Sequence, residues 1–184
     1  NSSPRWSPST VSSHRYRVSG VTLASDVPLP ELTPAPRHAT PDCTLRGLAD
    51  LRFGARPRWT HHWRFPDGRL WLSLGRARSA YRLRFTDRVD FVISAGGARI
   101  TYCPRGKQTP DTIRHLALDQ VLPLALAARG HLVLHASAVA TPAGGVAFLA
   151  GPGLGKSTLA ASFAAAGSAF ICDDCLVIDD CGSR

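Results

Sequence analysis

The residues best suited to chemistry form a short glycine-rich segment that ends in a lysine and two hydroxyl side chains. Its nine positions are Ala150, Gly151, Pro152, Gly153, Leu154, Gly155, Lys156, Ser157 and Thr158. We expect an apolar strand over 146–149 before it and an Ala-rich helix over 156–166 after it. Glycines allow tight turns that aim several backbone N–H groups at one point, where a helix start adds partial positive charge. The pattern therefore predicts a phosphate-binding loop.

Lys156 and Ser157 give this loop its expected chemistry. In the motif, the lysine reaches the β- and γ-phosphates of a nucleotide, and the serine hydroxyl binds a magnesium ion. Ala150 departs from the strict pattern, which has glycine at that position; we expect alanine to fit a strand-like backbone there. The alternative interpretation is a glycine-rich turn before an ordinary helix. The Lys-Ser-Thr sequence after the last glycine favours the phosphate-binding loop.

Two adjacent acids follow a strand expected over 169–172. Asp173 lies 17 residues after Lys156, at one helix and one turn from the loop. Phosphoryl transfer needs a carboxylate that holds the metal and a group that accepts a proton from the attacking hydroxyl. Neighbouring side chains on a strand point in different directions, so Asp173 and Asp174 are expected to divide these two roles. The residues alone do not say which acid has which role, and a solvated acidic strand end is the alternative.

His135 and the cysteines show weaker indications of a functional role. Most single histidines in strands have a structural role, and from the residues alone we expect that role for His135 and for His131 nearby. Cys172 and Cys175 have the spacing of a metal-binding pair, but no second pair accompanies them, so we interpret them as buried thiols rather than as a zinc site. The chain has five cysteines and a polar segment over 1–14 in place of a secretory signal. These features predict reduced thiols and a cytoplasmic location.

The net charge of +9 is concentrated in the first part of the chain. Residues 1–109 hold 18 Lys or Arg against 7 Asp or Glu, whereas residues 110–184 hold 4 against 6. The arginines are spread singly and no nucleic-acid-binding signature appears, so we favour a solvated surface. A nucleic-acid-binding basic domain is the weaker alternative. No apolar run approaches the length of a membrane span, so no membrane partner is expected.

Hydrophobic periodicity and turn residues divide the chain into four parts. Residues 1–14 are predicted to be a disordered tail, and 15–108 a small antiparallel β-rich domain with strands near 16–23, 70–74, 80–85, 90–94 and 98–103. A loop is expected over 54–69. Thr109 and Pro110 predict the start of a bridging helix over 109–130, with a kink at Pro123. Residues 131–184 hold the phosphate-binding loop.

The order of these motifs resembles the HPr kinase/phosphorylase family, especially its shorter HPr-serine-kinase-related members. The resemblance rests on the strand 134–139 with His135, the loop 148–158, and Cys172-Asp173-Asp174, with a further similarity over 16–32. It spans about residues 15–180 and is most specific over 131–180. Pro152 stands where the family has a serine-like residue, and the family continues well beyond the paired acids. We therefore expect a fragment that lacks the C-terminal part of the family, and because the chain begins at Asn1 and has no Met, we expect that the true N-terminus is also not in view.

The resemblance implies both a fold and an activity. The fold would be α/β, with a P-loop kinase core of the phosphoenolpyruvate-carboxykinase type after the β-rich domain. The activity would be ATP-dependent, Mg²⁺-dependent transfer of the γ-phosphate to a serine of a small protein or peptide. Lys156, Asp173, Asp174 and His135 would be catalytic, with His135 assisting the acid, and Ser157 and Asp173 would be the metal ligands. The alternative is a non-catalytic ATP-binding module, and the oligomeric state, a homo-oligomer included, stays open.

Overall fold

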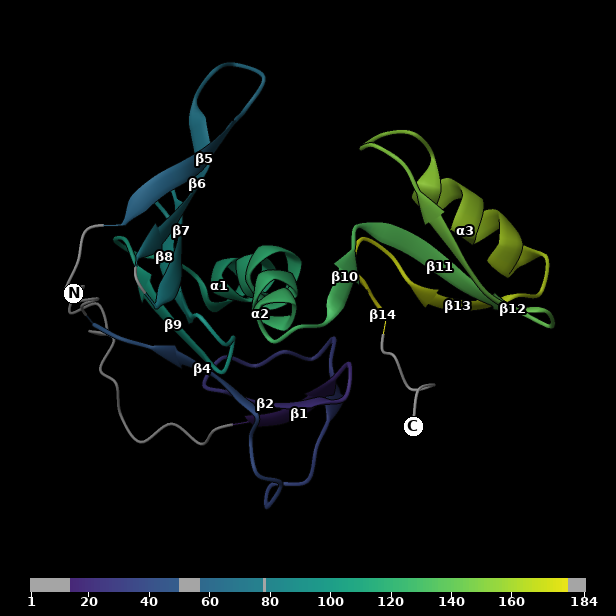
Figure 1. Cartoon of the computed structure of the whole chain (residues 1–184), viewed down its shortest axis with the longest axis horizontal. Helices are drawn as coiled ribbons and strands as arrows, with labels where there is room; N and C mark the ends of the chain where they lie inside the picture. The colour runs from purple at the N-terminus through teal and green to yellow at the C-terminus, as the bar shows by residue number, and fades with distance from the viewer. Residues whose placement is uncertain (1–13, 50–56, 78, 179–184) are drawn as a thin grey trace, which may run out of the picture. The chain divides into compact units, whose positions relative to one another are not determined.

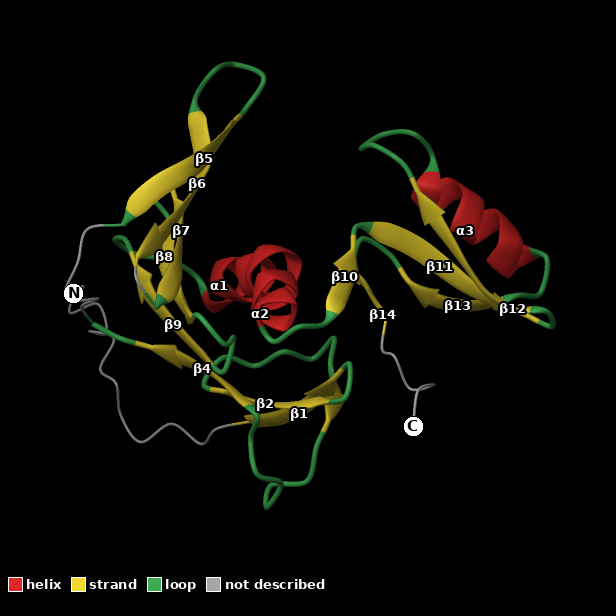
Figure 2. Ribbon diagram, viewed as in Figure 1, coloured by secondary structure: helices red, strands yellow, loops and turns green. Residues whose placement is uncertain are grey.

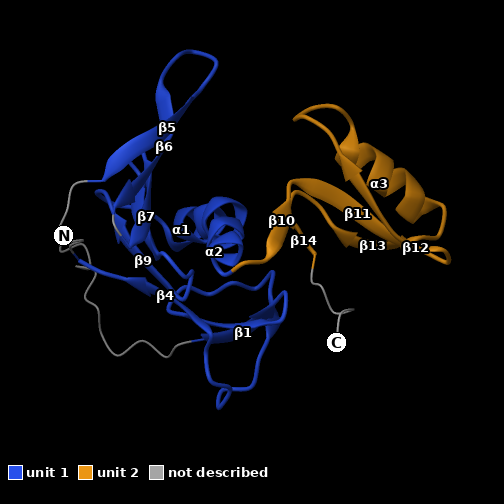
Figure 3. Cartoon of the chain, viewed as in Figure 1, with its two compact units in different colours: residues 1–129 blue, residues 130–184 orange. Residues whose placement is uncertain are grey.

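The computed structural model describes residues 14–49, 57–77 and 79–178. Among them, 46% lie in strands and 18% in helices (Figure 2). The chain divides into two compact units, Asn1–Arg129 and Gly130–Arg184 (Figure 3). The predicted tail over 1–14 falls almost wholly outside the described residues. No helix in the described ranges is long and apolar enough to cross a membrane.

The first unit is built on one nine-stranded sheet (Figure 1). The strands lie in the order β3-β1-β2-β4-β9-β8-β7-β6-β5. Most pairs are antiparallel hairpins, but β2 with β4 and β4 with β9 are parallel, so the sheet is mixed and the antiparallel domain predicted for 15–108 was wrong in this respect. The strands are β1 (His14–Val18), β2 (Val21–Ser25), β3 (Thr33–Pro34), β4 (Cys43–Gly47), β5 (Arg58–Arg64), β6 (Leu70–Ala77), β7 (Ala80–Phe85), β8 (Val89–Ser94) and β9 (Arg99–Pro104).

One face of this sheet carries the hydrophobic core. Successive side chains of a strand point to opposite faces, and the buried residues alternate accordingly. The rings of Phe85 and Phe91 meet edge to face at 5.9 Å, and that of Tyr102 lies 6.0 Å from Phe91. Other fully buried members of this face are Leu23, Leu45, Val89, Ile93 and Ile100. The opposite face is polar.

A helical segment covers the apolar face, and it consists of α1 (Pro110–Leu116), the π-helical turn η1 (Ala117–Val121) and α2 (Leu122–Ala128). It begins as predicted, because Thr109 Oγ1 accepts a hydrogen bond from the Thr112 amide at 3.2 Å. The π-helical turn η1 directly precedes α2, and Pro123 lies in the first turn of α2. Figure 1 shows the segment lying against the curved sheet.

The second unit contains two small antiparallel sheets and one helix. The strands β12, β11 and β13 form one sheet in that order, and β10 pairs with β14 in the other. Helix α3 packs against the three-stranded sheet, with Phe163 5.4 Å from Phe148. The elements are β10 (Leu132–Leu134), β11 (Ala136–Thr141), β12 (Gly144–Leu149), α3 (Lys156–Ala165), β13 (Ala169–Cys172) and β14 (Leu176–Ile178).

The predicted α/β fold with a P-loop kinase core of the phosphoenolpyruvate-carboxykinase type was wrong. The described residues are mostly β, and the largest assembly is the mixed sheet of the first unit. In the second unit, the hairpin from Thr141 to Gly144 places β12 beside β11 with antiparallel register, and β13 pairs antiparallel to β11 as well. Only one helix, over 156–165, packs with these strands in the described part of the second unit. One helix is too little for an α/β layer architecture.

Candidate functional site

The predicted phosphate-binding loop lies between β12 and α3, as the sequence indicates. β12 ends at Leu149 and α3 begins at Lys156. Gly153 and Gly155 have φ of +75° and +81°, a conformation that glycine adopts without the strain of a Cβ atom. Gly155 is the N-cap of α3 and has no side chain to cap the first-turn N–H groups. The loop thus offers uncapped donors at the positive end of a helix.

Lys156 folds back over the loop. Its Nζ donates a hydrogen bond to the Gly151 carbonyl at 3.3 Å, and only 7% of the residue is exposed. An ammonium group with so little exposure to water attracts an anion strongly. The loop and the first turn of α3 therefore combine a fixed positive charge with backbone donors.

Asp173 lies at the end of β13 and joins that strand to the loop. Its Oδ1 accepts hydrogen bonds from Ser157 Oγ at 3.0 Å, from Ser137 Oγ, and from the Asp174 amide at 3.1 Å. The Ser137 bond has the largest effect on the pKa of Asp173 and lowers it below its usual range; Ser157, the Asp174 amide and Lys156 act in the same direction. The Asp173 carboxyl is therefore held as a carboxylate.

Asp174 is turned away from Asp173 by its backbone. Its φ of +65° is left-handed, a conformation that aspartate tolerates better than most residues. The turn leaves the Asp174 side chain 74% exposed, with Oδ1 4.0 Å from His135 Nε2. His135 Nδ1 also lies 3.0 Å from the Asp174 carbonyl oxygen. The two acids therefore face different partners, one the loop serine and the other the histidine.

Lys156, Ser157, His135 and Asp174 line one cavity of about 460 Å³ in the second unit. Of the residues proposed from sequence, it is lined by His135, Pro152, Gly153, Gly155, Lys156, Ser157, Thr158 and Asp174. Ala150, Gly151 and Leu154 do not line it, and Leu154 is 72% exposed. Asp173 also lies outside the lining and contacts the site through Ser157. His135 is in the break between β10 and β11 rather than inside a strand.

Ser137 is a site residue that sequence reasoning did not single out. It is fully buried on β11, opposite Phe148 of β12, and its hydroxyl orients Asp173. A buried hydroxyl needs a partner, and the sequence signal for it is a serine two residues after His135, within the apolar run 136–140.

The oxygen atoms beside the loop suit a hard cation. Ser157 and Asp173 supply a hydroxyl and a carboxylate oxygen 3.0 Å apart, and Mg²⁺ commonly takes one or two such ligands with water and phosphate oxygens completing its shell. Within the described ranges, no group of three or more His, Cys, Asp or Glu side chains could hold a metal ion. Burial raises the pKa of both the Cys172 and the Cys175 thiols, which disfavours the thiolate form.

The chain matches no protein-family model, no curated protein and no solved structure.

Proposed function

We propose that the second unit binds Mg·ATP and transfers the γ-phosphate to a serine hydroxyl of a small protein or peptide. The observation that carries the proposal is the single cavity lined by Lys156, Ser157, His135 and Asp174. It gathers a phosphate-binding cation, a metal-binding hydroxyl and a carboxylate base with a histidine partner. These are the parts that phosphoryl transfer requires.

Each side chain has a distinct role in this proposal. Lys156 and the N–H groups of the loop hold the β- and γ-phosphates. Ser157 and Asp173 would hold Mg²⁺, which neutralises charge on the phosphate oxygens when bound. Asp173 suits this role because it is oriented by three donors and its pKa is lowered.

Asp174 suits the role of general base. It is exposed to the cavity and makes no bond to the loop serine, so a substrate hydroxyl can approach its carboxylate. The acceptor serine loses its proton to Asp174 as its oxygen bonds to the γ-phosphorus. The bond from that phosphorus to the β–γ bridging oxygen breaks, and ADP leaves with the electron pair. His135 would help to position Asp174, because its Nδ1 lies 3.0 Å from the Asp174 carbonyl oxygen and its Nε2 lies 4.0 Å from Oδ1 of the carboxylate.

Isothermal titration calorimetry with Mg·ATP tests the binding step. We expect binding by the parent chain and at least a tenfold loss in Lys156→Ala. Lys107→Ala is the matched control, because Lys107 is the other lysine of the chain and lies in the first unit. Equal affinities for the two variants would contradict the proposed role of the loop.

Transfer is tested separately with γ-labelled ATP and a library of serine peptides. The proposal expects label on peptides with serine and none on matched peptides with alanine, and loss of labelling in Asp174→Asn. Binding without any transfer would instead support the alternative, a non-catalytic ATP-binding module.

A further inference from the structure

The polar face of the nine-stranded sheet is rich in arginine. In β9, Ile100 and Tyr102 point into the core, so Arg99, Thr101 and Cys103 lie on the opposite face. The register extends that face to Arg46, which is opposite Thr101, and to Arg84, which is opposite Asp90. We call this surface the arginine face. It comprises Arg15 and Arg17 of β1, Arg46 of β4, Arg82 and Arg84 of β7, Arg99 of β9, and Arg105 directly after β9.

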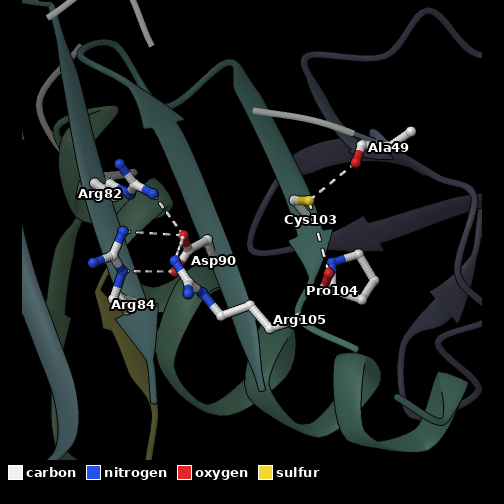
Figure 4. A network of polar contacts seen from close by, with 7 residues as sticks. All are labelled: Ala49, Arg82, Arg84, Asp90, Cys103, Pro104 and Arg105. Atoms are coloured by element: carbon white, nitrogen blue, oxygen red, sulfur yellow. Dashed lines mark hydrogen bonds and ion pairs between the residues drawn. The ribbon is translucent and has the colours of Figure 1, made fainter. Parts of the chain in front are cut away.

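Asp90 is the single acidic residue within the described strands β1–β9. Its carboxylate accepts from Arg82 Nη2 at 2.6 Å, from Arg105 Nη2 at 2.9 Å and from Arg84 Nε at 3.2 Å (Figure 4). One carboxylate offsets one of the three positive charges. The side chains of Arg84 and Arg105 stay 34% and 44% exposed. Asp90 therefore fixes the guanidinium groups in place, while parts of the Arg84 and Arg105 side chains remain open to solvent.

Aromatic rings lie beside these guanidinium groups. The Trp59 ring centre is 5.1 Å from the Arg84 guanidinium carbon and 5.9 Å from that of Arg82. His62 lies 6.4 Å from Trp59 and shares the polar face, because its Nδ1 is 2.9 Å from the hydroxyl of Ser73, the residue opposite Arg84. Two guanidinium groups and two rings thus lie close together at one end of the arginine face.

We propose that the arginine face binds single-stranded nucleic acid. Arginines on β1, β4, β7 and β9 form a positive path across about five strand spacings, roughly 24 Å, along which a phosphate backbone can lie. Trp59 and His62 offer π surfaces on which bases stack irrespective of sequence. An acidic polypeptide would match the charge but has no bases to stack on these rings. An open sheet face also presents no helix or two-stranded ribbon to the major groove of a duplex.

This assignment changes the expectation drawn from the sequence. The arginines are spread singly along the chain, which indicates a solvated surface. Pairing of the strands nevertheless collects seven of them on one face, where Asp90 is the one acid that the described strands β1–β9 contain. The proposal is independent of the nucleotide-binding loop, because every residue in it belongs to the first unit.

Fluorescence anisotropy of labelled oligo-rU and oligo-dT of about 12 nucleotides tests the proposal across about 50–200 mM salt. The test variant combines Arg17→Gln, Arg46→Gln and Arg99→Gln, which leave the Asp90 cluster intact. The matched control combines Arg37→Gln, Arg69→Gln and Arg88→Gln. These three arginines are exposed and lie outside the strands, so their substitution removes the same charge without changing the arginine face. Circular dichroism melts establish that both triple variants are folded.

We expect the test variant to bind at least tenfold more weakly than the parent. The slope of log affinity against log salt should become less steep by about 2, because each lost phosphate contact reduces its magnitude by about 0.7. The control variant should retain the parent affinity to within about twofold, and Trp59→Leu should weaken binding at least fivefold through lost stacking. Equal weakening by both triple variants would overturn the proposal. The proposal would also be overturned if poly-L-glutamate of equal charge displaced the oligonucleotide and Trp59→Leu bound the oligonucleotide as tightly as the parent does. That result would assign the face to an acidic polypeptide.

Discussion

Ser157 and Asp173 are joined by a hydrogen bond of 3.0 Å between Oγ and Oδ1, although they lie 16 positions apart in the chain. This bond connects the first turn of α3 to the end of β13. A second serine, Ser137 of β11, donates to the same oxygen. The Asp173 carboxylate is thereby fixed beside the loop, whereas the Asp174 side chain is exposed and faces His135.

Asp173→Asn is expected to abolish the metal dependence of ATP binding. The amide keeps the size of the side chain but removes the charge that attracts Mg²⁺. Calorimetric titration should show at least a tenfold weaker affinity for Mg·ATP, which corresponds to about 1.4 kcal/mol, with unchanged affinity for ATP in EDTA. Asp174→Asn is the matched control and should retain the metal dependence. The assignment of the two acids is wrong if the two variants behave alike.

Gly155→Ala should weaken Mg·ATP binding by about fivefold or more. Gly155 has a φ of +81°, and an alanine in the left-handed region costs about 1–2 kcal/mol. Because a Cβ there has no heavy atom within 4 Å, the cost arises from the backbone alone.

Gly151→Ala provides the comparison for this loop effect. Its φ is not positive, and its Cβ would make only an ordinary contact of 3.5 Å with Leu154 Cδ1. The same calorimetric titration should therefore give nearly the parent affinity. A larger loss in Gly151→Ala than in Gly155→Ala would argue against the role of the left-handed backbone.

Local features of the candidate site could be predicted from sequence, because they depend on short-range patterns. The strand, loop and helix around Lys156 follow from glycines between an apolar run and an Ala-rich run. The strands predicted near 70–74, 80–85, 90–94 and 98–103 are confirmed as β6 to β9, since each alternates and is bounded by turns. The hydrogen bond from Ser137 to Asp173 could not be predicted in this way, because it depends on the pairing of β11 with β13.

Pairing between strands distant in sequence could not be predicted. The loop expected over 54–69 contains the seven-residue strand β5, within the described part of that range. Its two register shifts, after Trp59 and after Trp63, disrupt the alternation that would have identified it. The parallel contacts of β4 with β2 and β9 also leave no local pattern. The fold class was wrong for this reason, since it was inferred from motifs rather than from strand pairing.

Asp90→Asn is expected to destabilise the first unit by about 3 kcal/mol, because it leaves partly buried guanidinium groups without their counter-charge. All four tryptophans lie in residues 1–71, so tryptophan fluorescence during urea unfolding reports this unit. Arg69→Gln breaks an exposed ion pair with Asp67, which water screens, and should leave the unfolding midpoint close to that of the parent. A loss as small for Asp90→Asn would show that the cluster does not stabilise the sheet.

The same carboxylate predicts a pH dependence. Burial raises the pKa of Asp90, but the hydrogen bonds from Arg105, Arg82 and Arg84 outweigh burial, so its pKa lies below its usual range. A depressed folded-state pKa contributes stability that is complete above the unfolded pKa, about 3.9, and is lost as pH falls through the folded value. Urea unfolding should therefore show a parent-to-Asp90→Asn difference that is constant from neutral pH to about pH 5 and shrinks below about pH 4. A difference that grows on acidification would contradict the lowered pKa.

Gly97→Ala should strongly destabilise the contact between the sheet and its covering helix. A Cβ at Gly97 would lie 2.1 Å from the Ala125 carbonyl oxygen and 2.6 Å from Arg129 Cγ, and the φ of +66° adds backbone strain. The helix backbone cannot yield as a flexible side chain would, so we expect a loss of at least about 2 kcal/mol. Gly96→Ala is the matched control, because its Cβ would meet nothing within 4 Å and its φ is not positive. Urea unfolding followed by tryptophan fluorescence should separate the two variants by their midpoints. Similar midpoints would mean that α2 does not pack closely against the turn between β8 and β9.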